Sequence, residues 1–203
     1  MEFEFSKNRI VFERELSNLD KLVIRFTQVL DIVGVEYVII SGYIAILFGR
    51  SRETEDVDLF IEEMPFETFA RFWEELGKEG FECVNVSTPL EGYDDYLKEQ
   101  SALRFAVKGT FIPNFELKFP KTPYNRYSLN HKIEVQLNGE KLMTSEIELQ
   151  IAFKLYLGSK KDFEDARHLF RVFNEKLNMG LLQMHISELK VEKQAKRILW
   201  KKY

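Results

Sequence analysis

The sequence predicts an α/β (α+β) fold in which a mixed β-sheet with flanking helices precedes a helical subdomain. Three observations predict it. Short β-branched runs alternate with helix-periodic segments, an Asn-Gly hairpin signal closes that part, and only helical patterns follow. We therefore divide the chain into an α/β core, 1–143, and a C-terminal helical subdomain, 144–203. The 45% hydrophobic and 14% aromatic shares suit a protein with a substantial core.

The elements of the α/β core follow from apolar periodicity and from turn residues. In order, the patterns predict a helix over 17–33 that Ser17 caps, a strand over 36–40, a short helix over 43–49, a strand over 56–61, a helix over 65–76, and strands over 81–87, 101–109 and 115–119. The polar stretch 88–100 reads as a loop or a short helix. Two alternating runs over 131–144 flank Asn138-Gly139, which predicts a tight hairpin.

The helical subdomain starts at a capping-box pattern, Ser145 with Glu148. An apolar stripe follows as far as Leu155, and Gly158 ends this first helix. A second helix is predicted over 161–177. A basic amphipathic tail over 186–203 is the best local patch for RNA phosphates, although such a tail is more often a solvated face.

Composition narrows the class of protein. The net charge of −4 gives no overall basic field for nucleic acid. One cysteine, Cys83, excludes an internal disulfide and fits a reducing compartment. No apolar stretch reaches the roughly 18 residues of a membrane span, and the N-terminus lacks the apolar region of a signal peptide. We expect a soluble, cytoplasmic protein with no membrane partner.

Two acids stand on one face of the predicted strand 56–61. Side chains alternate along a strand, so Asp56 and Asp58 point the same way while Val57 and Leu59 anchor the other face. Carboxylates spaced like this can converge on a divalent cation, and oxygen ligands favour Mg²⁺ or Mn²⁺. The alternative is an edge strand with a solvated acidic face.

Ser41 and Gly42 lie where a strand passes into a helix. Small residues there let backbone N–H groups approach a phosphate, and a helix N-terminus favours the anion. An ordinary tight turn is the alternative. Arg50 and Arg52, between this turn and the acids, are able to neutralise phosphate charge.

The whole segment resembles the polymerase-β-like nucleotidyltransferase superfamily, and more closely its small prokaryotic members such as the AbiEii-like toxin nucleotidyltransferases. The matching residues, in order, are Ser41, Gly42, Tyr43, Ala45, Gly49, Arg52, Thr54, Asp56 and Asp58. Ser41 replaces the first glycine of that pattern. The resemblance extends over roughly 36–172, because the helix bearing Lys154 and the Lys-Asp-x-x-Asp start of the next helix are also similar.

The resemblance implies the roles of individual residues. Asp56 and Asp58 would hold the metal, and a third carboxylate would ligate it and act as general base. Glu116 is preferred for that third position over Glu134, which lies in the later hairpin. The nucleotide-binding set implied is Ser41, Gly42, Arg52, Thr54, Lys154 and Asp162. For Lys154 the alternative is a side chain that snorkels at the edge of an apolar stripe, and for Asp162 it is an acid favoured in the first turn of a helix.

The expected activity is Mg²⁺- or Mn²⁺-dependent transfer of a nucleoside monophosphate from an NTP to an acceptor hydroxyl. By resemblance to toxin-type members, the acceptor is an RNA, such as the 3′ end of a tRNA, or a protein, and an antitoxin is a candidate partner. The alternative is a non-catalytic nucleotide- or partner-binding protein that retains the fold.

Overall fold

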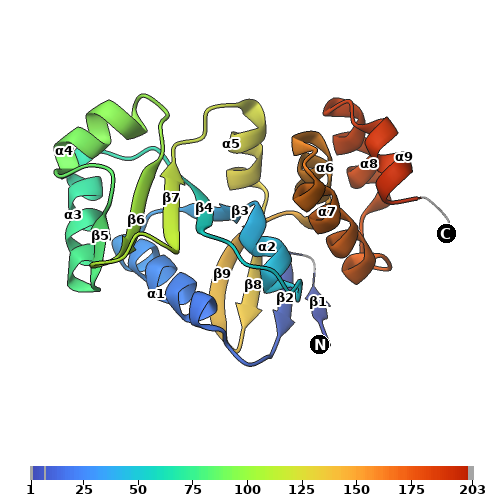
Figure 1. Cartoon of the computed structure of the whole chain (residues 1–203), viewed down its shortest axis with the longest axis horizontal. Helices are drawn as coiled ribbons and strands as arrows, with labels where there is room; N and C mark the ends of the chain where they lie inside the picture. The colour runs from blue at the N-terminus through green and yellow to red at the C-terminus, as the bar shows by residue number, and fades with distance from the viewer. Residues whose placement is uncertain (1, 7, 201–203) are drawn as a thin grey trace.

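The computed structural model of the chain describes residues 2–6 and 8–200, and its strands form one mixed sheet in the order β1-β2-β8-β9-β3-β4-β7-β6-β5 (Figure 1). The strands are β1 (Glu4–Ser6), β2 (Arg9–Phe12), β3 (Tyr37–Ile40), β4 (Asp56–Ile61), β5 (Phe81–Cys83), β6 (Leu103–Val107), β7 (Asn114–Lys118), β8 (Lys132–Leu137) and β9 (Glu140–Ser145). The helices are α1 (Asn18–Val33), α2 (Gly42–Leu47), α3 (Phe66–Lys78), α4 (Pro89–Glu91) with a π-helix (Gly92–Leu97) after it, α5 (Pro123–Asn130), α6 (Ile147–Leu157), α7 (Lys160–Phe173), α8 (Met179–Glu188) and α9 (Glu192–Ile198). The predicted α/β fold class is confirmed.

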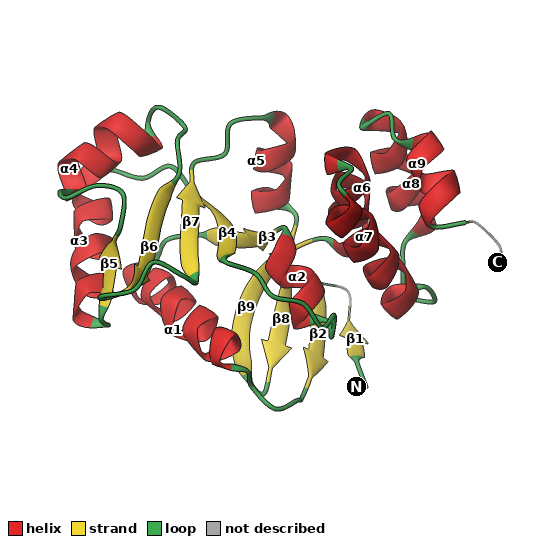
Figure 2. Ribbon diagram, in the orientation of Figure 1, coloured by secondary structure: helices red, strands yellow, loops and turns green. Residues whose placement is uncertain are grey.

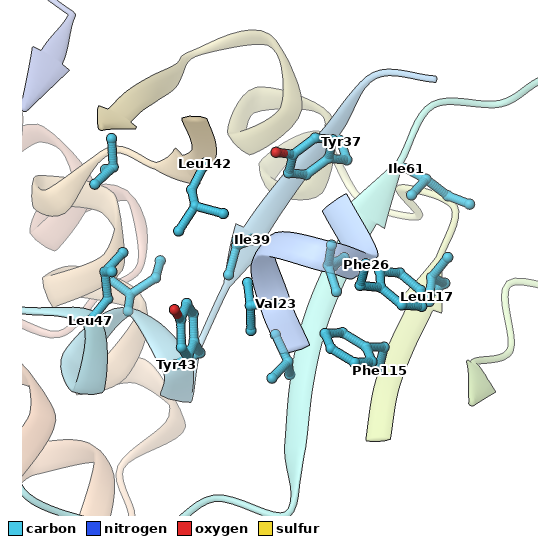
Figure 3. Packing of buried hydrophobic residues seen from close by; sticks show 14 of the residues in the cluster. Val23, Phe26, Tyr37, Ile39, Tyr43, Leu47, Ile61, Phe115, Leu117 and Leu142 are labelled. Atoms are coloured by element: carbon cyan, nitrogen blue, oxygen red, sulfur yellow. The ribbon is translucent and has the colours of Figure 1, made fainter. Parts of the chain in front are cut away.

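One face of the sheet packs on α1, which starts at the predicted cap, Ser17, and forms a capping box with Asp20. Phe26 of α1 stacks on Phe115 of β7 with ring centroids 4.0 Å apart, and Figure 3 shows these rings side by side. Val57 of β4 pairs in register with Phe115, so both face this core and are fully buried. The apolar half of the alternation in β4 and β7 is therefore the half that α1 covers.

The opposite face of the same strands carries the polar half of the alternation. Farther along β4, Phe60 and Val38 of the neighbouring β3 pack against Leu129 of α5. Helix α5 therefore covers the end of this face near Phe60. Asp56 and Asp58, nearer the start of β4, remain partly exposed.

The helices α6 to α9 follow the hairpin β8–β9 and gather beside α2 (Figure 2). Helix α6 contacts α7 and α8, and α7 packs against α2. The division of the chain at residue 143 stays a prediction. Within the described residues, no helix combines the length and the apolar character that crossing a bilayer requires.

Some elements differ from the sequence predictions. The capping box at Ser145 is wrong, because Ser145 is the last residue of β9 and pairs with Lys132, while Glu146 precedes α6 without a side-chain cap. Strands β1 and β2 and helices α5 and α8 were not predicted. The Asn138-Gly139 hairpin is confirmed, with φ of 53° and 84° at the two residues.

Candidate active site

Two neighbouring parallel strands bring three carboxylates to one face. In the register of β4 with β7, Asp58 lies directly opposite Glu116, and Asp56 lies opposite Asn114. Period-two alternation then places Asp56, Asp58 and Glu116 on the face that α1 does not cover. Thr54 donates its hydroxyl to the Asp56 backbone oxygen at 3.0 Å and to its carboxylate at 3.2 Å, which orients the first acid.

Two cations already contact these acids. Lys118, two residues beyond Glu116 on the same face, places its Nζ 2.8 Å from Glu116 Oε2 and 3.5 Å from Asp58 Oδ1. Arg104 of β6 lies opposite Glu116 in register and donates from Nε to Oε1 at 2.8 Å. The alternation along 115–119 also places Lys118 on this face. Lys118 was nevertheless not among the site residues predicted from the sequence.

The electrostatic environments of the paired acids differ. Burial raises the pKa of Asp58, and the charges of Asp56 and Glu116 raise it further, against the opposing effect of Lys118. Burial also acts to raise the pKa of Glu116, but hydrogen bonds from Lys118 and Arg104 outweigh it and the pKa lies below its ordinary value. Glu116 is therefore ionised at neutral pH.

Glu134, the other candidate for the third carboxylate, lies on β8. Two strands, β9 and β3, separate β8 from β4 in the sheet. Its carboxylate pairs with Arg9 at 2.9 Å. The structure thus brings Glu116, and not Glu134, beside Asp58.

The face of the sheet that carries Asp56, Asp58 and Glu116 is called the acid face below. The Ser41-Gly42 turn borders it, because Ile40 at the end of β3 pairs with Asp58. A buried amide, Gln150 of α6, holds this turn. The Ser41 N–H donates to Gln150 Oε1 at 3.2 Å, and Gln150 Nε2 donates to the Ser41 carbonyl at 2.8 Å. No local pattern indicates this role of Gln150, since its partner is 109 residues away.

The backbone of this turn explains the small residues in it. Ser41 has φ 65° and ψ −129°, a conformation that favours glycine. At the next position, a Cβ on Gly42 would lie 2.3 Å from Nη2 of Arg52, so a side chain there would displace the guanidinium.

Replacing Ser41 by Gly should therefore stabilise the protein relative to Ser41→Ala. The strain of a non-glycine residue in this region is on the order of 1–3 kcal/mol, and the greater freedom of glycine in the unfolded chain offsets about 0.4–1 kcal/mol. We expect Ser41→Gly to exceed Ser41→Ala by about 1 kcal/mol in the free energy of unfolding, measured by urea titration. An alanine variant that is the more stable of the two would contradict the strain.

Helices α6 and α7 contribute a network of charged side chains that reaches the Ser41-Gly42 turn. Asp165 of α7 is fully buried and pairs with Arg50, with Arg52 at 3.1 Å and with Lys154 at 3.2 Å. Lys154 also contacts Asp162 at 2.8 Å and places its Nζ 3.4 Å from Ser41 Oγ. Hydrogen bonds from Lys154 and Ser159 outweigh the effect of burial and lower the pKa of Asp162.

This network changes the interpretation of Lys154. The lysine is 3% exposed and ion-paired, so it does not snorkel at the surface. Asp165, which the sequence shows one turn after Asp162, joins three cations, although it was not among the predicted site residues. Arg52, Lys154 and Asp162 thus come together at the turn, while Thr54 stands beside the acids.

The carboxylates on this face are the candidate ligands of a metal ion. Among residues 2–6 and 8–200, no three His, Cys, Asp or Glu side chains converge as a formed metal site. The carboxylates of Asp56, Asp58 and Glu116 are nevertheless oxygen donors on one face, which suits Mg²⁺ or Mn²⁺. The donor chemistry fits a divalent cation, but Lys118 contacts two of the three acids.

Comparisons with known proteins agree with this architecture. Residues 19–89 match the model of a family described as a nucleotidyl transferase of unknown function (DUF2204). A comparison with curated proteins gives no match.

Two solved structures are similar over most of their length. An antigenic nucleotidyltransferase-like protein from Paracoccidioides brasiliensis is 20% identical, with a TM-score of 0.54, over 90% of this chain and 92% of its own. The structure of ANT(2'')-Ia in complex with adenylyl-2''-tobramycin is 13% identical, with a TM-score of 0.55, over 86% and 98% of the two chains. The chain therefore has a nucleotidyltransferase fold, in agreement with the resemblance to the polymerase-β-like superfamily, while the closer likeness to the AbiEii-like toxin enzymes stays a prediction.

Proposed function

We propose that the chain transfers a nucleoside monophosphate from an NTP to an acceptor hydroxyl and releases pyrophosphate, with Mg²⁺ or Mn²⁺ as cofactor. One observation supports this most: Asp56, Asp58 and Glu116 share a face beside the Ser41-Gly42 turn, within a nucleotidyltransferase fold. Asp56 and Asp58 would hold the cation, and Glu116 would act as general base. When bound, the cation would neutralise charge that develops on the phosphates.

In this proposal Glu116 accepts the proton of the acceptor hydroxyl. The acceptor oxygen forms a bond to the α-phosphorus, the bond from that phosphorus to the β-phosphate oxygen breaks, and pyrophosphate leaves. The hydrogen bonds from Lys118 and Arg104 lower the pKa of Glu116 against the effect of burial, which keeps its carboxylate ionised. Removing a general base of this kind typically lowers a rate about 10²–10⁴-fold.

The Ser41-Gly42 turn would cradle the phosphates with backbone N–H groups. Helix α2 has six residues, so local N–H groups rather than a long helix dipole would act on the anion. Arg52 and Lys154 are already paired with Asp165. We therefore propose that they shape the turn and that their charge reaches the triphosphate only in part.

The acceptor is a further proposal. A tRNA 3′ end or a protein hydroxyl, and a toxin-like role with an antitoxin partner in the cytoplasm, remain predictions from the sequence resemblance. The complex of ANT(2'')-Ia with adenylyl-2''-tobramycin adds a small hydroxylated molecule as a candidate acceptor class.

A second candidate function is a non-catalytic nucleotide- or partner-binding protein. The observation that favours it is the contact of Lys118 with both Asp58 and Glu116. Acids that an internal ammonium already neutralises need no metal for a stable fold.

Label transfer separates these two functions. The protein would be incubated with each of the four NTPs, labelled at the α-phosphate, with Mg²⁺ or Mn²⁺ and with total cell RNA, total protein or a mixture of small hydroxylated compounds. Covalent label in one acceptor class, absent with Asp56→Asn, is the expected result. NTP binding without label in any class would favour the binding protein instead.

A further inference from the structure

The acid face is asymmetric in how its charges are neutralised. Lys118 Nζ lies between Asp58 and Glu116, at 3.5 Å and 2.8 Å, and Arg104 holds the other oxygen of Glu116. Asp56 has no ion pair within the described part of the chain, and its partner is the neutral hydroxyl of Thr54. The pair Asp58–Glu116 is thus bridged by a cation, while the pair Asp56–Asp58 is not.

The position of Lys118 follows from the sheet and not from a mobile loop. Lys118 is the last residue of β7 and lies opposite Phe60 of β4. The side chains of Glu116 and Asp58 are 12% and 20% exposed, so their contacts with the ammonium are partly shielded from water. A divalent ion placed between these two acids would stand next to a positive charge that the same strand supplies.

We infer that Lys118 is a built-in cation that occupies the position between Asp58 and Glu116, so that the site takes one divalent cation, at Asp56 and Asp58, rather than two. This inference rests on the proposed function. It assigns Lys118 as a positioning residue, which holds Glu116 beside Asp58. Glu116 then serves as base while Lys118 and Arg104, rather than a second metal ion, balance its charge.

The test counts bound Mn²⁺, added alone, from the electron paramagnetic resonance signal of the free ion. The variants are Lys118→Met, which keeps the length of the stem and removes the charge, and Lys141→Met as matched control. Lys141 also pairs with an aspartate, Asp31 at 2.8 Å, but lies away from the acid face on β9. We expect one bound Mn²⁺ per chain in the wild type and in Lys141→Met, and two in Lys118→Met.

Two Mn²⁺ ions in the wild type, or a single ion in folded Lys118→Met, would overturn the inference. Binding by Lys118→Met alone would also overturn it, because the lysine would then block the whole site. Circular dichroism checks folding, and Lys118→Gln replaces the methionine variant if that one does not fold. Failure of the proposed function is a separate result, since label transfer would be absent whatever the number of bound ions.

Discussion

Replacing Glu116 by Gln should lower the rate of nucleotidyl transfer about 10²–10⁴-fold while leaving NTP affinity nearly unchanged. Glutamine has almost the same shape but cannot take the acceptor proton. The register of β4 and β7 places Glu116 opposite Asp58, so the substitution acts at the acid face and not at the Ser41-Gly42 turn. The measurements are single-turnover transfer of labelled nucleotide and titration with a non-hydrolysable NTP.

Glu134→Gln is the matched control, because Glu134 is also a strand glutamate in an ion pair, with Arg9. It should leave transfer within the error of the wild type. Loss of transfer in Glu134→Gln together with an active Glu116→Gln would reject Glu116 as the base. Equal loss in both would indicate a general effect on the sheet, which melting temperatures would reveal.

Local patterns predicted the elements that surround the acid face. Alternation along 56–61 and 115–119 correctly assigned the buried and polar faces, and Ser17 and Gly158 correctly marked the ends of their helices. These signals are local because a strand's period and a helix cap depend on neighbouring residues alone. The choice of Glu116 over Glu134 came from the family resemblance, because Glu134 lies in a hairpin after the position expected for the third acid.

Elements whose position depends on residues far away in the sequence could not be predicted from local patterns. Strand β2 joins the sheet by parallel pairing with β8, more than a hundred residues later, and Phe3, beside β1, packs on Phe48 and Phe173. The alternation of Phe3 and Phe5 was the available signal for β1. Helix α5 also carried a signal, since Thr122 caps it in a capping box with Asn125 and Pro123 stands in its first turn. Ser145 shows the opposite case. Its sequence pattern is that of a helix cap, but the residue pairs with Lys132 as the last residue of β9.

The cluster around Asp165 shows the same limit for the candidate site. The sequence placed Lys154 and Asp162 near one another on successive helices, but the buried acid that joins them to Arg50 and Arg52 depends on how α7 packs against α2. Ion-pair partners are chosen by this packing. A single sequence therefore presents Lys154 as either a phosphate ligand or a surface residue. Its burial and ion pairs exclude the surface residue, and the phosphate ligand stays a prediction.

Asp165→Asn should reduce the free energy of unfolding by about 3–5 kcal/mol. The carboxylate is fully buried, and removing its charge leaves Arg52 and Lys154, 9% and 4% exposed, without their shared counter-ion. Asparagine keeps the shape of the side chain, so the loss would come from charge and not from a cavity. Denaturant unfolding followed by circular dichroism measures it.

Glu164→Gln provides the matched control on the same helix. Glu164 pairs with Arg50 at 2.6 Å but is 44% exposed, so its loss should change stability by only about 0–1 kcal/mol. Because Asp165 also fixes Arg52 against Gly42, the NTP affinity of Asp165→Asn should fall under conditions where the variant is still folded, while that of Glu164→Gln should hold. Equal stability losses in the two variants would mean that the helical half is held by its apolar contacts. The buried charges would then be a consequence of the docking of α7 and not a cause of it.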